Sequence, residues 1–378
     1  MLRRITSEAC RFSARSAVPA LQQSVSGERW ASTLPVGYMK RGSGGRSSVS
    51  GIQAAIFGST GFLGRYVLTE MGKNGTLCIL PTRCNENARQ HLRLMGDLGQ
   101  LHFMDYDIRD EDLIAKAVDG ADVVINMVGR EFETGNFSFE MVNVDFAKRL
   151  AELSSKAGVS KLIHFSALGA STSSPSKYYQ TKAAGEAAVL EAFPSATVIR
   201  PAPLVGSEDR LLNEYAKFLT IPGRIPLIDG GDTKMQPVNA ADVAIALGKI
   251  VTDPNSTGKV YELAGPKVYK MKDLAALVCD AVREPVRTIF LPTPLAKILA
   301  LPRDILQARI PFPFPTNPMF TVDHIEGLAN NYVLNPKTTA LTFKDLGISP
   351  RNLEGLNIDY LRAFRSGGYD FGTTAGSA

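Results

Sequence analysis

Tyr178 and Lys182 have the types and spacing of a proton-transfer pair. They are four residues apart, so in a helix both side chains lie on one face. A lysine in that place can lower the pKa of a phenol from about 10 and make Tyr178 a proton donor or acceptor. Ser166 ends an apolar run twelve residues earlier and could hold a substrate oxygen. The Tyr–Lys spacing alone is common by chance, and it becomes specific only beside a nucleotide site.

A glycine-rich turn supplies the candidate nucleotide site. Gly58, Gly61 and Gly64 form a G-x-x-G-x-x-G pattern between an apolar run at 52–57, typical of a buried strand, and apolar residues at helical spacing. Without Cβ atoms these glycines allow a tight turn and a close approach to a pyrophosphate, which the helix N-terminus then faces. A glycine turn without a ligand is the alternative. The residues expected to contact a dinucleotide here are Gly58, Ser59, Thr60, Gly61, Phe62, Leu63 and Gly64.

Two arginines favour NADP(H) over NAD(H). Arg83 lies nineteen residues after Gly64, where an NAD-binding protein would place an acid for the ribose hydroxyl, and Arg65 directly follows the last glycine. Guanidinium groups in these places would accommodate a 2′-phosphate, although either arginine could instead lie on an ordinary solvated face. Further strand ends expected to border the cofactor are Asp107 and Ile108, near the adenine, and Asn126.

The elements that must position these residues alternate between strands and helices. This alternation predicts an α/β fold with a doubly wound parallel sheet, in which residues 52–235 form a Rossmann-type dinucleotide-binding domain and residues 236–365 a smaller C-terminal lobe. Strands are expected near 52–57, 76–81, 101–106, 121–128, 161–166 and 197–201, and helices near 62–72, 110–119, 138–157, 178–193 and 208–220.

The two ends of the chain have their own composition. Residues 1–33 are rich in Arg, Ser and Ala, are poor in acids and lack the apolar centre of a secretory signal. They predict a mitochondrial transit peptide, with a disordered basic tail as the alternative. Residues 34–51 are polar and glycine-rich, which predicts an extended arm, and residues 366–378 predict a flexible tail.

Charge and cysteine content limit the function classes. Residues 1–50 carry eight Lys and Arg against two Glu, which leaves 34 Lys and Arg against 35 Asp and Glu in the rest. This near-neutral remainder argues against a nucleic-acid-binding regulator, because such binding needs concentrated positive charge. The four cysteines and four histidines lack metal-ligand spacing, so we expect no metal and a reducing compartment. The sequence contains no run of 18 apolar residues, so no segment is expected to span a membrane.

Residues 285–320 form an apolar segment interrupted by eight prolines. Because proline breaks helices, one long helix is not expected there. Short amphipathic helices could instead place Ile298 and Leu299 opposite Lys297 and Arg303, as a docking segment for a partner protein or a membrane surface. Ordinary core of the smaller lobe is the alternative.

The glycine turn and the serine, tyrosine and lysine described above together resemble the short-chain dehydrogenase/reductase superfamily, in its extended or atypical form. The resemblance covers roughly residues 52–280. It implies Asn143 as a fourth member of the catalytic set, Pro201 near the nicotinamide, and contact of Tyr178 and Lys182 with the cofactor.

Longer strings resemble a narrower family, the nucleotide-binding accessory subunits of mitochondrial NADH:ubiquinone oxidoreductase, respiratory complex I. This family implies a tightly held NADPH and a structural or assembly role beside the other complex I subunits, on the matrix side of the inner membrane, at the junction of the matrix arm with the membrane. Electron transfer from NADH to ubiquinone would belong to other subunits. The alternative is an active NADPH-dependent reductase of a carbonyl or quinone that uses Ser166, Tyr178 and Lys182. The strings lie at 44–51, 58–65, 91–100, 124–130, 207–210 and 234–238.

Overall fold

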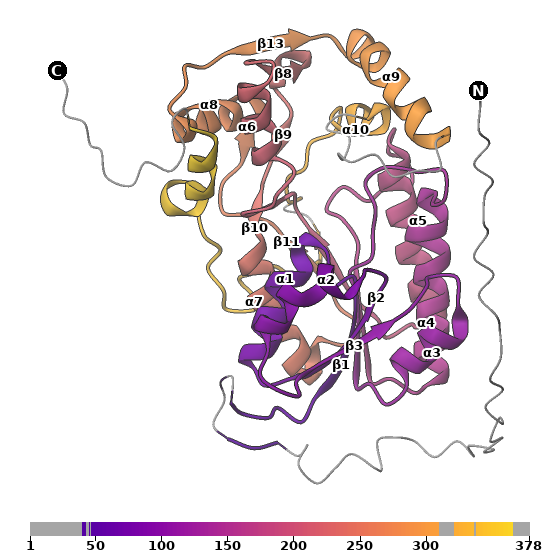
Figure 1. Ribbon diagram of the computed structural model, residues 1–378. Coiled ribbons are helices and arrows are strands. Elements are labelled where there is room, and N and C mark those ends of the chain that lie inside the picture. The colour runs from indigo at the N-terminus through magenta and orange to yellow at the C-terminus, as the bar shows by residue number, and fades with distance from the viewer. Residues whose placement is uncertain (1–39, 43–44, 46, 310–320, 336–337, 366–378) are drawn as a thin grey trace, which may run out of the picture.

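A seven-stranded parallel sheet forms the centre of the protein (Figure 1). The computed structural model describes residues 40–42, 45, 47–309, 321–335 and 338–365. The strand order is β3-β2-β1-β4-β5-β6-β11, and it reverses direction along the chain between β1 and β4. The predicted doubly wound α/β fold is therefore confirmed. The strands are β1 (Gln53–Phe57), β2 (Leu77–Thr82), β3 (Leu101–Asp105), β4 (Val123–Asn126), β5 (Lys161–Phe165), β6 (Thr197–Pro201) and β11 (Val260–Leu263).

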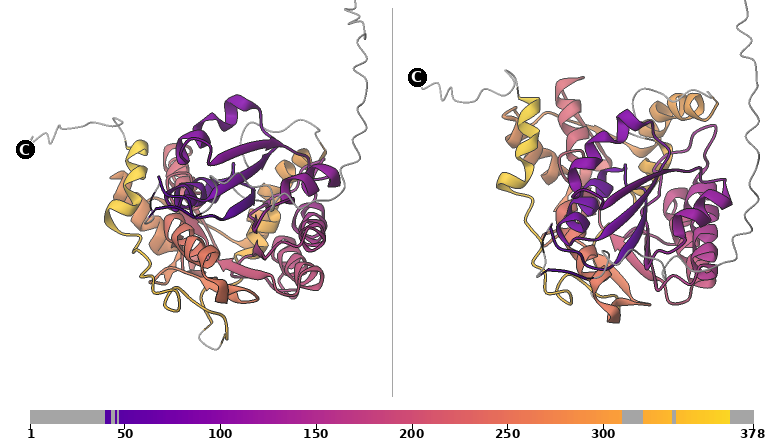
Figure 2. Two further views of the ribbon diagram at one scale, coloured as in Figure 1. Left: turned by 90° about the horizontal axis from the view of Figure 1, so that it is seen from below. Right: turned by 60° about the horizontal axis from the view of Figure 1, so that its bottom comes forward.

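Successive side chains of β1 pack into two separate cores. Ala54 and Ile56 belong to the core that includes residues of α1 and α7, whereas Ala55 and Phe57 belong to the core that includes residues of α3 and α4. A strand changes face at every residue, so this unbroken apolar run is buried on both faces. Figures 1 and 2 show the two helical layers on opposite sides of the sheet. These helices are α1 (Phe62–Lys73), α7 (Ala240–Thr252), α3 (Glu111–Val118), α4 (Phe146–Lys156) and α5 (Lys177–Ala192).

The smaller lobe lies above the sheet in Figure 1 and has a core of its own. Short strand pairs join β8 to β13 and β9 to β12, and Tyr215, Met271 and Leu361 are fully or nearly buried between its helices. Its elements are α6 (Leu212–Thr220), β8 (Ile225–Ile228), β9 (Lys234–Met235), β12 (Tyr269–Lys270), α8 (Met271–Val282), β13 (Thr288–Leu291), α9 (Thr293–Arg309), α10 (Val322–Gly327) and η7 (Gly355–Phe364). Elsewhere the chain forms α2 (Glu86–Arg89), η3 (Gln90–Met95), η4 (Met141–Asp145), β7 (Leu204–Val205), η5 (Asp229–Gly231), β10 (Val238–Asn239) and η6 (Pro254–Ser256).

The boundary expected at residue 235 needs correction. Helix α7 packs against α1, and β11 extends the main sheet by pairing in parallel with β6. Residues 240–263 therefore complete the sheet domain, after the chain has already formed part of the smaller lobe. The sequence did not predict this division between the two lobes, because the pairing of β11 with β6 depends on long-range contacts that a local pattern does not contain.

The segment 285–320 also differs from its prediction. Residues 288–291 form β13, and residues 293–309 form one helix of 17 residues that continues through Pro302. Pro302 is exposed, so the helix loses a hydrogen bond at the surface, where water can replace it. Residues 310–320 lie outside the described residues. No helix in the described part of the chain is long and apolar enough to cross a membrane.

The described end of the predicted N-terminal arm folds against the sheet domain. Arg41 pairs with Val49 as an isolated antiparallel bridge, and the backbone N–H of Ser50 donates to the carbonyl of Gly75 at 3.0 Å. This contact joins the arm to the turn between α1 and β2. The predicted transit peptide (1–33) and the predicted tail (366–378) lie outside the described residues, as do residues 34–39.

Candidate nucleotide and catalytic site

The glycine turn lies where the strand order reverses. Gly58 follows β1 with φ of 87°, and a Cβ at this position would come within 2.9 Å of the Met127 backbone at the end of β4. A Cβ on Gly64 would lie 2.3 Å from the backbone oxygen of Ser59. Backbone packing therefore requires both glycines, and the turn they form opens at the carboxyl ends of the strands, the usual ligand position in such sheets.

A cavity of about 760 Å³ opens at this point between the sheet and the smaller lobe. It brings together the glycine turn, the arginine after β2, the serine after β5 and the Tyr–Lys pair of α5, which are far apart in the sequence. The predicted site residues that line it are Gly58, Thr60, Gly61, Phe62, Leu63, Gly64, Arg83, Ser166, Tyr178, Lys182 and Pro201.

Other predicted cofactor residues lie outside the cavity wall. Arg65 forms an ion pair with Glu208 and does not line the cavity, so 2′-phosphate contact by Arg65 stays a prediction. Ile108 is 2% exposed and belongs to a hydrophobic core, so it does not border an adenine. Asn126 is turned inward, where its side-chain oxygen holds the backbone of the loop that follows β4. Ser59 is fully buried beneath the turn.

Three arginines gather around one aromatic ring, and two of them, Arg83 and Arg130, line the cavity. The guanidinium carbons of Arg83, Arg109 and Arg130 lie 5.1, 5.1 and 5.5 Å from the centroid of the Phe137 ring. The arginine ion pairs in the described part of the chain involve other arginines. Burial and then the charges of Arg83 and Arg210 lower the pKa of Arg130. This cluster is therefore an uncompensated positive site suited to an anion.

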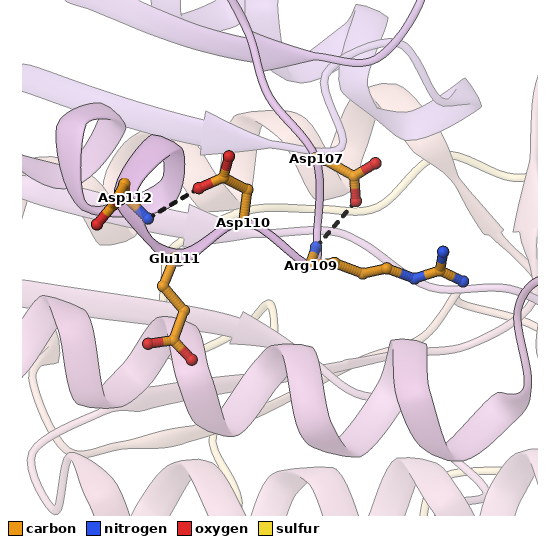
Figure 3. A pocket seen from close by; sticks show the side chains of 5 residues that line it. All are labelled: Asp107, Arg109, Asp110, Glu111 and Asp112. Carbon is orange, nitrogen blue, oxygen red and sulfur yellow. Dashed lines mark hydrogen bonds between the residues drawn. The ribbon is translucent and has the colours of Figure 1, made fainter.

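The sequence prediction missed Arg109 and Arg130. Arg109 follows β3, and its backbone N–H donates to the carboxylate of Asp107 at 2.9 Å, which tightens the turn. Figure 3 shows the Arg109 side chain extending away from the acidic groups of Asp110 and Glu111. These residues line a separate hollow. Asp107 belongs to that hollow and does not line the main cavity. Because both arginines come within a few residues of a predicted strand end, the crevice rule could have found them.

The Tyr–Lys pair does not have the ionisation that its spacing suggested. Burial, and then the charge of Glu131, raise the pKa of Tyr178 well above its ordinary value. Burial lowers the pKa of Lys182 to about 8, and its Nζ donates to the backbone oxygen of Phe165 at 3.2 Å. The lysine is thus directed to the protein backbone, and the expected lowering of the phenol pKa is absent. Loss of solvation is the main cause of the raised pKa of the phenol.

Asn143 lies at a local distortion of the helix before β5. It is part of η4, a π-helical turn, and its Nδ2 donates to the hydroxyl of Thr181 at 3.1 Å while its buried Oδ1 has no partner among the described residues. A Cβ on Gly185 would lie 2.1 Å from the Asn143 backbone oxygen, so α5 approaches this turn closely. A Cβ on Gly129 would lie 2.8 Å from Lys182 Nζ and 3.7 Å from Asn143 Oδ1. The expected fourth residue therefore stands beside Lys182. Such π turns are often found at functional sites.

The helix that carries Tyr178 and Lys182 is capped from the smaller lobe. The Asp323 carboxylate accepts hydrogen bonds from Ser176 Oγ at 2.8 Å, Lys177 N at 2.5 Å and Tyr178 N at 3.3 Å. Ser176 itself makes no side-chain cap. A carboxylate at a helix N-terminus satisfies free N–H groups and favours the helix dipole. Docking of the smaller lobe therefore positions the Tyr–Lys pair.

Comparison with known proteins identifies the family. Residues 54–264 match the NAD dependent epimerase/dehydratase family. The chain is 46% identical over 345 residues to NADH dehydrogenase (ubiquinone) 1 alpha subcomplex subunit 9, mitochondrial, of Arabidopsis thaliana, across 90% of this chain and 85% of that protein. The protein of the same name from Mus musculus is 42% identical over 326 residues, across 86% of this chain and 84% of that one. The chain belongs to this subunit family. The resemblance to complex I accessory subunits is thereby confirmed.

A solved structure supports the fold. The NADPH-dependent quinone oxidoreductase of Escherichia coli, solved with NADPH, superimposes with a TM-score of 0.61 at 21% identity, across 79% of this chain and 96% of that one. At this identity the likeness concerns the fold. The family match identifies a site of the nicotinamide-dinucleotide type, and the glycine turn fits that group because it lies at the carboxyl end of β1, where the strand order reverses.

Proposed function

We propose that this protein holds NADP(H) as a structural ligand and acts as an accessory subunit of mitochondrial complex I. The observation that carries the cofactor assignment is the cluster of Arg83, Arg109 and Arg130 around Phe137, with no carboxylate paired to any of them in the described residues. A 2′-phosphate would supply the missing negative charge and accept charge-assisted hydrogen bonds. The glycine turn would hold the pyrophosphate, and Tyr178 and Lys182 the nicotinamide ribose.

The test of this cofactor assignment compares two nucleotides. Arg83→Ala and Arg130→Ala should each raise the Kd for NADPH by about 10- to 100-fold, because a hydrogen bond to a charged group contributes roughly 1.5–3 kcal/mol. The Kd for NADH, which lacks the phosphate, should stay within about twofold. Isothermal titration measures both. Arg93→Ala is the control, because Arg93 pairs with Glu86 away from the cavity. Equal losses for both nucleotides would contradict the assignment.

The structural role is supported by the ionisation of the Tyr–Lys pair. A phenol with a raised pKa is a weaker acid, so Tyr178 is a poor proton donor to a carbonyl oxygen, which is the role that a reductase would need from it. The relatives in Arabidopsis thaliana and Mus musculus are named as subunits of the NADH dehydrogenase. Blue-native separation of mitochondrial membranes tests the assignment, with co-migration with complex I expected. Migration of the protein alone would overturn it.

We propose that the protein lies on the matrix side of the inner membrane, at the junction of the matrix arm with the membrane. We further propose that it contacts the other complex I subunits and the membrane surface through an apolar surface of β13 and α9. Phe290, Ile298 and Leu299 are 64%, 66% and 63% exposed, which is unusual for large apolar side chains. Ile298→Glu with Leu299→Glu should release the subunit from complex I without emptying the nucleotide site. Flotation with vesicles of inner-membrane lipids tests the membrane contact. The exposed apolar residues of this surface are Ile289, Phe290, Leu295, Ile298, Leu299, Leu301, Ile305 and Leu306.

A second candidate function is an active NADPH-dependent reductase. The Ser166 hydroxyl favours it, because its Oγ is buried at the cavity wall without a partner among the described residues and could hold a substrate oxygen. The discriminating measurement is oxidation of NADPH by the isolated protein with a panel of carbonyl compounds. Turnover that Tyr178→Phe abolishes, with NADPH still bound, would favour this function.

A further inference from the structure

Residues 206–210 lie between β7 and α6, at the wall of the cavity. They include Ser207 to Arg210, one of the strings that resemble the complex I subunit family. Neither the glycine turn nor the arginine cluster around Phe137 gives these residues a role. Glu208 and Arg210 line the cavity. We call residues 206–210 the clasp, because their side chains attach this segment to three separate parts of the protein.

The clasp is attached to α1, the helix that begins at the glycine turn. The Glu208 carboxylate forms an ion pair with the guanidinium of Arg65. The backbone N–H of Ser207 donates to the hydroxyl of Tyr66 at 3.3 Å, and Ser207 Oγ lies 3.2 Å from the same oxygen. A Cβ on Gly206 would lie 2.7 Å from the Tyr66 hydroxyl, so the clasp backbone packs closely against this helix.

The clasp is also attached to the loop that follows β4. Arg210 forms an ion pair with Glu131 at 2.8 Å. The guanidinium carbons of Arg210 and Arg130 lie 5.6 and 5.1 Å from the centroid of the Phe132 ring, within the range of cation–π attraction. Glu131 and Phe132 line the same cavity as Arg210. The clasp and the β4 loop therefore meet at the cavity wall.

These two attachments hold the clasp across the nucleotide crevice. In a doubly wound sheet the ligand lies at the carboxyl ends of the strands, where the strand order reverses. Here the order reverses between β1 and β4. Helix α1 follows β1 and the Glu131 loop follows β4, so a segment bound to both of them spans the crevice between them.

The third attachment is buried and joins the clasp to the smaller lobe. Asp209 is 4% exposed, and its carboxylate accepts hydrogen bonds from Tyr360 Oη at 2.6 Å and from Asn213 N at 2.8 Å. The ion pairs of Glu208 and Glu131 are open to water, with 34–60% of each side chain exposed. Exposed ion pairs are weak, whereas hydrogen bonds to a buried charge are strong. The clasp therefore opens at α1 and at the β4 loop and stays with the smaller lobe.

We infer that Glu208 and Glu131 are positioning residues that hold the clasp over the nucleotide crevice and set the rate of nucleotide exchange. The inference rests on the proposed binding of NADP(H), and it adds a closure made of contacts within the protein. Both ion pairs join protein to protein, so they favour the closed clasp equally in the free and the nucleotide-bound protein. Such a closure lowers the association and dissociation rates by the same factor and leaves Kd unchanged.

Removal of each charge tests the inference in the full-length protein. Glu208→Gln and Glu131→Gln should each raise both the association and the dissociation rate of NADPH about 2- to 5-fold, the change that corresponds to roughly 0.4–1 kcal/mol for an exposed ion pair. Kd should stay within about twofold. Filter binding of tritiated NADPH gives the association rate, and a chase with excess unlabelled NADPH gives the dissociation rate. Glu86→Gln is the matched control, because its ion pair with Arg93 is exposed and lies away from the cavity.

Amide hydrogen exchange gives a second readout that needs no nucleotide. Residues 206–211 should exchange faster in both variants than in the wild type, and at the wild-type rate in Glu86→Gln. Unchanged exchange of the clasp, or unchanged NADPH rates in both variants, overturns the inference. A lower Kd in Glu208→Gln also overturns it, because the freed Arg65 would then bind a phosphate of the nucleotide. A wild-type protein that binds no nicotinamide nucleotide instead refutes the proposed function, and the inference with it.

Discussion

Asp323→Ala should loosen the smaller lobe and the nucleotide site together. The carboxylate accepts three hydrogen bonds from the first turn of α5, where Ser176 makes no side-chain cap of its own. An N-cap contributes roughly 0.5–2 kcal/mol and a hydrogen bond to a charged group roughly 1.5–3 kcal/mol. These contributions overlap at one site, so we expect a loss of about 3 kcal/mol in the free energy of unfolding.

The same substitution should weaken nucleotide binding, because α5 also carries Tyr178 and Lys182. Urea unfolding of the nucleotide-free protein measures the stability change, and titration with NADPH measures the affinity. Asp304→Ala is the matched control, because Asp304 accepts one hydrogen bond from Val322 N at 2.7 Å and does not touch α5. It should cost about 2 kcal/mol, within the roughly 1.5–3 kcal/mol of one hydrogen bond to a charged group, and leave the affinity within about twofold. The reasoning is refuted if Asp323→Ala changes neither quantity more than the control does.

Three further perturbations test the site. Gly58→Ala should prevent NADPH binding and destabilise the protein by about 2–4 kcal/mol in urea unfolding. The reason is that φ is 87° and the new Cβ would lie 2.9 Å from the backbone of Met127, directly after β4. A variant that binds NADPH and unfolds with wild-type stability would disprove this. His164 has a pKa lowered by burial from 6.5 to about 3, so below pH 6.5 the unfolded chain takes up a proton that the folded chain does not. The free energy of unfolding should therefore fall as the pH falls, and His164 should account for roughly 2 kcal/mol of that loss between pH 7 and pH 5. This part of the loss should be absent in His164→Gln and present in the control His102→Gln, whose histidine is exposed. Tyr178→Phe should leave nucleotide content and complex I assembly nearly unchanged, whereas Lys182→Met should lower both. Loss of an NADPH-dependent reduction by the isolated Tyr178→Phe protein, with NADPH still bound, would instead favour a catalytic tyrosine.

Local patterns predicted the sheet domain well. The six expected strand positions correspond to β1–β6, and the expected helices correspond to α1, α3, α4, α5 and α6, with α4 preceded by the π turn. The reason is that the strands are buried on both faces and the helices have one apolar side. Strands therefore appear as short apolar runs and helices as apolar residues at helical spacing. The π turn at Asn143 was missed because it changes the hydrogen-bond spacing without changing the apolar period.

The candidate site was predicted only where one short segment carries the chemistry. The glycine turn and the Tyr–Lys pair are each contained in one short segment, and their residues line the cavity. Ionisation was not predictable from spacing, because the raised pKa of Tyr178 reflects burial and the neighbouring Glu131, which approaches from another loop. The ion pair of Arg65 was not predictable for the same reason, since its partner Glu208 lies 143 residues away.

By itself the sequence determined the fold class, the nucleotide turn and the membership of a subunit family, since each depends on short strings and on the alternation of apolar residues. Tertiary structure alone decided which charges are free and which are paired. It gathered Arg83, Arg109 and Arg130 from three different loops around one ring, and it capped the helix that carries Tyr178 and Lys182 with Asp323 of the other lobe. Contacts of this kind follow from the order of strands and the docking of lobes, and their free energy depends on burial, which becomes defined only once the chain is packed.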